Sequence, residues 1–121
     1  MKILLCYTFQ NLTVRNSMET FLKTVGALND ETRLQILRFI HKNGEVCVCE
    51  IEEAFSMIQS RVSRHLKILK DAGFLRVDRR GKWAYYQVRS PLDRFRLECL
   101  EEISYLEMPL LTSLCACKDT K

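Results

Sequence analysis

The sequence predicts a mainly α-helical (α+β) domain with the element order α-α-α-α-β-β-α. Apolar residues recur at three- and four-residue spacing in five segments, which is the period of an amphipathic helix. Aromatic and β-branched residues concentrate in two short segments on either side of a charged turn, which predicts a β-hairpin. The chain has 121 residues and is 47% hydrophobic, so it can bury one small core. We expect the domain over residues 17–108, a loosely held N-terminal arm over 1–16, and a cysteine-containing tail over 109–121.

The first two helices are predicted from cap residues and apolar stripes. Asn16 or Ser17 can cap the first helix, and Asn29-Asp30 can start the second. Asn43-Gly44 is a typical end for the second helix. The apolar stripes consist of Met18, Phe21, Leu22, Val25 and Leu28 in the first helix, and of Leu34, Leu37 and Ile40 in the second.

Two further helices follow, a short one and the clearest one in the sequence. Residues 45–50 lead into the short helix, for which we expect a buried side of Ile51, Ala54, Phe55 and Ile58. The clear helix covers residues 59–72, has Val62, Leu66 and Leu69 on one stripe, and ends at Gly73. Ser56 and Gln59 are three residues apart, so they could form a capping box at its start.

The C-terminal part of the domain reads as a hairpin and a last helix. Residues 74–77 and 83–88 are the expected strands, joined by a charged turn at 78–82. Pro91 suits the first turn of the last helix, and Pro109 should end or kink it. Its stripe would be Leu92, Phe95, Cys99, Ile103 and Leu106.

Positive charge is concentrated in one part of the chain. Residues 61–82 carry eight basic and two acidic side chains, although the net charge of the whole chain is only +4. Such a block indicates a surface that faces a polyanion, with an ordinary solvated helix face as the alternative. Because a basic helix follows a short helix after a tight turn, the pattern is that of a helix-turn-helix.

The side chains of the basic helix have the chemistry of a DNA recognition helix. Gln and Arg can bind adenine and guanine edges in the major groove, and Ser and Lys suit phosphate oxygens. The outward candidates are Gln59, Ser60, Arg61, Ser63, Arg64 and Lys67, and His65 is given a positioning role. Arg79, Arg80 and Lys82 lie at the hairpin tip, where a wing would contact the backbone or the minor groove. The predicted fold is therefore a winged helix-turn-helix.

Five segments, in this order and register, resemble the ArsR/SmtB family of metal-responsive repressors. They are Asp30–Leu34, Glu45–Ile51, Ser60–Leu66, Ala72–Gly73 and Arg80–Tyr86. The resemblance covers about residues 18–106. It implies a homodimer formed by the first and last helices, and an inverted-repeat operator in double-stranded DNA. The chain departs from the family at Ile58, where the family often has a capping Ser.

Cys47-Val48-Cys49 is the strongest chemical signal in the sequence. Two thiols two residues apart can bind one soft ion if the backbone between them is extended, whereas on a regular helix they point apart. An ion that bridges them would deform the start of the helix that supports the recognition helix. The resemblance implies that this pair is an ion sensor, and the alternative is two small buried hydrophobic residues.

The inducer expected from the resemblance is trivalent arsenic (arsenite) or antimony. Such an ion takes three thiolates, and where the family's arsenic sensors have a third cysteine this chain has Glu52. Our preferred source of the missing thiol is Cys115 and Cys117 in the tail, with Cys6 and Cys99 as rivals. Four thiolates would instead suit cadmium, lead or zinc. The family's zinc site on the last helix is not expected, because no His follows Asp93 there.

Several other classes of protein do not fit the sequence. No apolar run is long enough to span a bilayer, so we expect no membrane partner and a cytoplasmic protein with reduced thiols. No nucleophile–base pairing or phosphate-binding glycine loop suggests an enzyme. A thiol-redox repressor remains an alternative, and a metal carrier would not need the basic helix.

Overall fold

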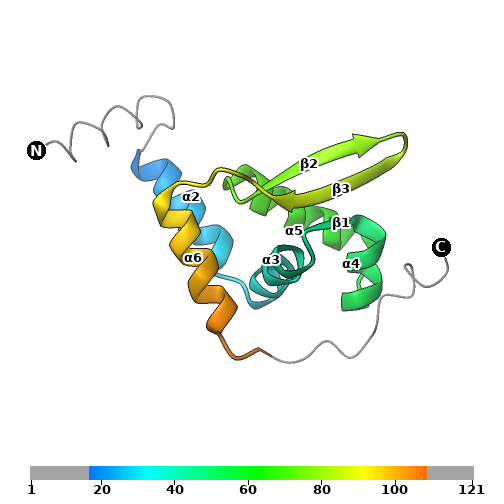
Figure 1. Cartoon of the computed structure of the whole chain (residues 1–121), viewed down its shortest axis with the longest axis horizontal. Coiled ribbons are helices and arrows are strands. Elements are labelled where there is room, and N and C mark those ends of the chain that lie inside the picture. Colours follow the sequence, from blue (N-terminus) through cyan, green and yellow to red (C-terminus); the bar gives the residue numbers. More distant parts are fainter. Residues whose placement is uncertain (1–16, 109–121) are drawn as a thin grey trace, which may run out of the picture.

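The computed structural model of the chain describes residues 17–108 (Figure 1). In this part the helices are α2 (Met18–Leu28), α3 (Glu31–Asn43), α4 (Val48–Phe55), α5 (Gln59–Asp71) and α6 (Arg94–Tyr105). The strands are β1 (Glu45–Cys47), β2 (Leu75–Arg80) and β3 (Trp83–Val88). The predicted order of helices around a hairpin is confirmed, and β1 is an additional element. The expected arm (1–16) and tail (109–121) lie outside the described residues.

Short polar side chains start three of the helices. Ser17 caps α2 by accepting a hydrogen bond from the N–H of Thr20, and Asp30 caps α3 by accepting one from the N–H of Arg33. Both caps were predicted from the sequence. At α6 the cap is Asp93, and the helix begins at Arg94, so the expectation that Pro91 forms its first turn is wrong.

The core is built around α3. This helix contacts α2, α5, α6 and strands β1 and β3, so side chains from most of the domain meet on it. The side chains of Ile36, Leu37 and Ile40 on α3 are completely buried. They pack in one cluster with Ile51, Val62, Leu66, Leu69, Phe74, Leu75 and Leu100.

The three strands form an antiparallel sheet in the order β1-β3-β2. β3 pairs with β2 in the hairpin and with β1 on its other side, where Val46 is opposite Tyr86 and Cys47 is opposite Tyr85. β1 has three residues and runs directly into α4, so no alternating pattern long enough to predict a strand exists there. In Figure 1 the hairpin projects from the body of the molecule beyond β1.

The second hairpin strand, β3, has the predicted bounds, but the first, β2, extends further than the sequence indicated. β2 extends to Arg80, which pairs with Trp83, so only Gly81 and Lys82 form the turn. Asp78, Arg79 and Arg80 are therefore strand residues rather than turn residues. The turn depends on Gly81, whose φ of +63° belongs to the left-handed region.

The junction between α4 and α5 also differs from the prediction. Ile58 is outside α4 and 65% exposed instead of buried. Ser56 ends α4 in the left-handed conformation, so it does not form a capping box with Gln59. The residue at the N-cap of α5 is Ile58, in an extended conformation.

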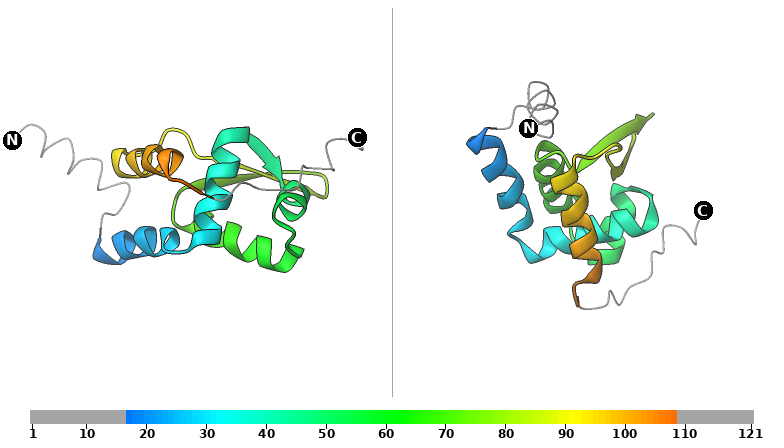
Figure 2. Two further views of the ribbon diagram at one scale, coloured as in Figure 1. Left: turned by 90° about the horizontal axis from the view of Figure 1, so that it is seen from below. Right: turned by 60° about the vertical axis from the view of Figure 1, so that its left-hand side comes forward.

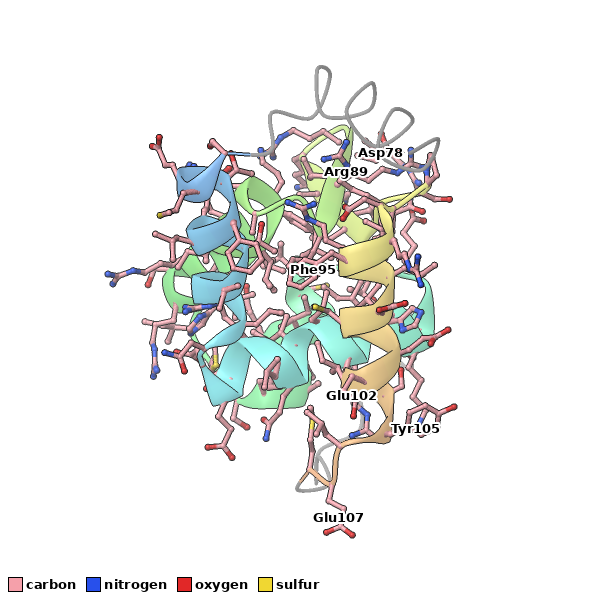
Figure 3. All side chains as sticks on the ribbon, turned by 90° about the vertical axis from the view of Figure 1, so that its left-hand side faces the viewer. Asp78, Arg89, Phe95, Glu102, Tyr105 and Glu107 are labelled. Carbon is pink, nitrogen blue, oxygen red and sulfur yellow. The ribbon has the colours of Figure 1, made fainter. Side chains whose placement is uncertain are left out.

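The apolar stripe of α2 points to the surface. Met18, Phe21, Leu22 and Val25 are exposed, while the buried residues of α2 are Thr24 and Ala27. On α6, Phe95 and Leu97 are exposed as well. The two helices lie beside each other on one side of the molecule, and the labelled Phe95 lies between them (Figure 3). Its ring is 5.5 Å from that of Phe21, centroid to centroid.

Within residues 17–108, no helix is both long and apolar enough to cross a membrane.

Candidate DNA interface and thiol site

Helix α5 presents a polar and basic face to solvent. Its residues Val62, Leu66 and Leu69 are completely buried, so the side chains between them point outward. The exposed side chains include every outward candidate named from the sequence: Gln59, Ser60, Arg61, Ser63, Arg64 and Lys67. In Figure 2 (left), α5 lies along one edge of the molecule, where a duplex can approach it.

His65 differs from its neighbours because it is half-buried and faces the body of the domain. Its Nδ1 lies 3.4 Å from Nη1 of Arg33 on α3. Burial lowers the pKa of His65 below 6.5, the opposing effect of the Asp30 carboxylate being smaller. The imidazole thus lies between α5 and α3, and its positioning role stays a prediction.

Arg33 joins three helices at this point. Its Nε donates a hydrogen bond of 2.8 Å to the carbonyl of Ala27 near the end of α2. Its Nη1 also lies 3.7 Å from Oδ2 of Asp30 at the start of α3. Because the same guanidinium reaches His65, it fixes the position of α5 relative to α2 and α3.

The wing carries its three basic residues in two different environments. Arg79 and Lys82 are exposed at the tip of the hairpin. Arg80 is held by carboxylates: its Nη2 lies 2.6 Å from Oε2 of Glu45, and its Nε lies 3.0 Å from Oδ2 of Asp78. The guanidinium of Arg80 also stacks over the ring of Tyr85 at 4.5 Å.

The two cysteines predicted to sense an ion, Cys47 and Cys49, lie where β1 becomes α4. Cys47 is the last residue of β1 and the N-cap of α4, in an extended conformation, and only 4% of it is exposed. Its N–H donates a hydrogen bond of 3.1 Å to Oε1 of Glu50. Cys49 belongs to the first turn of α4 and is half-buried. The backbone is extended at Cys47 but helical at Val48 and Cys49, so the extended link that two converging thiols require is not formed in this structure.

Two thiols make only part of an ion site. Among residues 17–108, no group of three or more His, Cys, Asp or Glu side chains is arranged to hold a metal ion. Cys115, Cys117 and Cys6 lie outside the described residues. Cys99 is half-buried on α6, where burial, followed by the charge of Asp93, raises the pKa of its thiol.

Arg96 is an anchoring residue that the sequence did not single out. Its Nε donates to the carbonyl of Ala72 at the end of α5 (2.8 Å), and its Nη2 donates to Oγ1 of Thr24 on α2 (2.9 Å). Its Nη1 lies 2.6 Å from Oδ1 of Asp93. The Asp93/Arg96 spacing is a sequence signal for a local pair, but the contacts with Ala72 and Thr24 depend on the tertiary fold.

The sequence of this chain is similar to those of bacterial regulators. Residues 30–77, which contain α3, α4, α5, Cys47 and Cys49, match the family model described as "Bacterial regulatory protein, arsR family". A cadmium resistance transcriptional regulatory protein (CadC homolog) of Staphylococcus aureus is 30% identical over 105 residues, which are 87% of this chain and 83% of that protein. The chain belongs to the arsR family of bacterial regulatory proteins. The relatives that show this membership are transcriptional regulators by name.

Two further comparisons are informative for this arsR-family chain. The arsenic resistance transcriptional regulator ArsR1 of Pseudomonas putida is 43% identical over 61 residues, which are 50% of this chain and 48% of that protein. The homodimeric winged helix-turn-helix DNA-binding domain Mb0332 of Mycobacterium bovis is 28% identical, with a TM-score of 0.61 and coverage of 74% and 84%. The matches to the first three curated relatives cover only 48–64% of those proteins.

Proposed function

We propose that this protein is a homodimeric repressor that leaves its operator when trivalent arsenic or antimony binds the thiolates of Cys47 and Cys49. The observation that carries this proposal is the position of Cys47. One residue ends β1, which pairs with the wing, and caps α4, the first helix of the helix-turn-helix. An ion held by this residue therefore acts on both DNA-contacting parts of the domain.

The exposed face of α5 supports recognition of duplex DNA. Arg61 and Arg64 are exposed on this helix, next to Gln59, Ser60 and Ser63 at its N-terminal end. Because its N-cap is Ile58, α5 begins with main-chain N–H groups that have no polar cap side chain, an arrangement that suits a phosphate. Arg79 and Lys82 extend the basic surface onto the wing.

The exposed apolar residues of α2 and α6 support a homodimer. Leu22 is 60% exposed and Phe95 is 41% exposed, although each belongs to a helix with a packed side. Covering such a face with a second copy would remove it from water. Two α5 helices related by twofold symmetry would then read an inverted repeat. The homodimeric M. bovis domain, to which this chain is similar, supports this assembly.

The proposed mechanism follows from the geometry around Cys47. In the structure Cys47 is buried, paired with Tyr85 through β1, and joined to Glu50 by the 3.1 Å hydrogen bond. Bringing its Sγ and that of Cys49 onto one ion requires the first turn of α4 to change shape, since i and i+2 side chains diverge on a helix. α4 packs on α5, so the change is passed to the recognition helix.

The chemistry of the ion depends on the remaining ligands. The two thiols supply soft donors, and we propose Cys115 and Cys117 as the source of a third. Cadmium, lead or zinc is the second candidate, because a relative that covers 87% of this chain is named as a cadmium resistance regulator. X-ray absorption of the loaded protein distinguishes these: three sulfur ligands support the metalloid, and four support the divalent ions.

Arsenite-dependent release of labelled operator DNA tests the sensor assignment. Cys47→Ser and Cys49→Ser should bind DNA with unchanged affinity but no longer release it, because each lacks one of the two thiolates. Cys99→Ser, a half-buried cysteine on α6, is the matched control and should release DNA like the unmodified protein. Release by both Cys47→Ser and Cys49→Ser would place the sensor elsewhere.

A further inference from the structure

One side-chain bridge joins the two outer strands of the sheet. Arg80 is on β2 and Glu45 is on β1, and β3 lies between these strands. Nη2 of Arg80 nevertheless reaches Oε2 of Glu45 at 2.6 Å by passing over the ring of Tyr85 on β3. Oε2 of Glu45 also accepts a hydrogen bond of 3.4 Å from the Gln87 side chain. Glu45 therefore links β2 to β1, in addition to the backbone pairing of β1 with β3.

This bridge is on the same face of the sheet as the sensor cysteine. Side chains alternate between faces along a strand, so Glu45 and Cys47 share one face of β1, and Val46 points into the core. Cys47 is opposite Tyr85, whose ring carries the Arg80 guanidinium. One partner of the ion pair, Glu45, thus lies two residues before Cys47. The other partner, Arg80, is next to Arg79 on the exposed part of the wing.

We propose that Glu45 is a positioning residue that transmits occupancy of the thiol pair to the wing. The inference rests on the function proposed above and adds a route to it. A shift of the β1–α4 junction moves Glu45, and Arg80 follows because its guanidinium is bound to that carboxylate. Arg79 and Lys82, which flank Arg80 and the turn, then change position relative to α5. The wing and the recognition helix no longer fit one duplex together.

The competing interpretation is that Glu45 is only a surface charge that repels phosphate. The two interpretations predict different changes in DNA affinity. A repelling charge acts equally with and without the bound ion, so its removal changes both dissociation constants by the same factor. A coupling residue changes their ratio. Because the two side chains are 52% and 32% exposed, we expect a ratio change of about three- to fivefold at most.

The test compares Glu45→Gln with Asp78→Asn. Both remove a carboxylate partner of Arg80, but Asp78 is on β2 itself, so its loss leaves the bridge to β1 in place. The Kd for operator DNA is measured by fluorescence anisotropy with and without arsenite. We expect Glu45→Gln to reduce the arsenite-induced increase in Kd about three- to fivefold, and Asp78→Asn to leave it unchanged. Because coupling is reciprocal, arsenite binds the free protein and the DNA complex with different affinities. In Glu45→Gln the ratio of these two affinities should fall by the same factor as the effect of arsenite on the Kd for DNA.

The outcomes separate this inference from the proposed function. Equal changes of both dissociation constants in Glu45→Gln, or an equal loss of coupling in Asp78→Asn, would overturn the role of Glu45 while the sensor assignment stands. If arsenite does not weaken DNA binding by the unmodified protein, the proposed function fails and the inference fails with it. As an ion-independent readout, amide exchange at Tyr85 and Gln87 in the free protein should accelerate in Glu45→Gln and not in Asp78→Asn.

Discussion

At the scale of single residues, the structure divides the basic side chains into two groups. Arg61 and Arg64 on α5 point to solvent, where base edges can be reached. Arg33 and Arg96 are mostly buried and bind main-chain carbonyls, those of Ala27 and Ala72. The same residue type therefore docks helices in one place, and we propose that it contacts DNA in the other.

Arg64→Ala should weaken operator binding by about 1–3 kcal/mol if the guanidinium contacts a base edge, because a bidentate contact is lost. Arg94→Ala is the control, since Arg94 is equally exposed but lies on α6, where it pairs with Glu98. Fluorescence anisotropy with the operator and with a scrambled duplex measures the effect. Equal affinity of Arg64→Ala and the unmodified protein would remove Arg64 from the base-reading set.

The half-buried His65 predicts a pH dependence of stability. The pKa of His65 in the folded state is below 6.5, its ordinary value, which applies to the unfolded chain. At a pH between these two pKa values, the unfolded chain binds a proton that the folded chain does not. Stability must then be complete above about pH 6.5 and fall as the pH decreases. Urea unfolding of the unmodified protein and of His65→Gln between pH 5 and 7.5 should show a shallower slope in the variant. The account is contradicted if the free energy of unfolding depends on pH as before in His65→Gln, but no longer depends on pH in the exposed-site variant His41→Gln.

At the scale of secondary-structure elements, the helices were more predictable than their junctions. The stripe of Val62, Leu66 and Leu69 predicted α5, and Asp30 predicted the start of α3. Both predictions succeeded because each signal depends only on residues close together in the sequence. β1 was missed because its identity comes from pairing with β3, which is about forty residues away in the sequence. Ile58 at the N-cap of α5 follows no capping preference, so sequence rules favoured Ser56 instead.

The junction between α5 and the hairpin depends on Gly73 and Arg96. Gly73 has a φ of +93°, and a Cβ added there would lie 2.8 Å from Nε of Arg96. Arg96 in turn binds Ala72, Thr24 and Asp93. This anchoring could not be read from the sequence, because its partners are distributed over three elements.

Arg96→Met should lower the free energy of unfolding by about 1–3 kcal/mol, because the partly buried carbonyl of Ala72 and hydroxyl of Thr24 lose their donor. Thermal unfolding followed by circular dichroism measures the loss. Arg94→Met, on the exposed face of the same helix, should leave the melting temperature nearly unchanged. Equal melting temperatures for both variants would show that Arg96 does not anchor α5.

At the scale of the whole molecule, the domain has two functional sides. Helices α2 and α6 form the side with the exposed apolar residues, and the wing projects away from it (Figure 1). The thiol pair lies where β1 meets α4. These two elements contact the wing and α5. The sequence predicted the α2 and α6 stripes but not their direction, since an apolar stripe has the same period whether it faces the core or a second subunit.

Leu22→Glu should shift the protein toward monomer, because it places a carboxylate in the proposed subunit contact. We expect the dimer dissociation constant to rise by at least about tenfold, since a buried unpaired charge is costly. Ile58→Glu, a change at an exposed apolar residue outside this face, should leave the dimer intact. Sedimentation velocity over a concentration series provides the measurement, and an unchanged dimer in Leu22→Glu would place the subunit contact on another surface.

The most direct measurement for the whole account is the affinity for operator DNA of the Cys47→Ser/Cys49→Ser double variant, with and without arsenite. The unmodified protein should lose affinity by about 5- to 150-fold when arsenite is added, the range of ordinary allosteric coupling. The double variant should bind DNA as tightly as the unmodified protein and keep that affinity in arsenite. A double variant that still releases its operator on addition of arsenite would contradict the account.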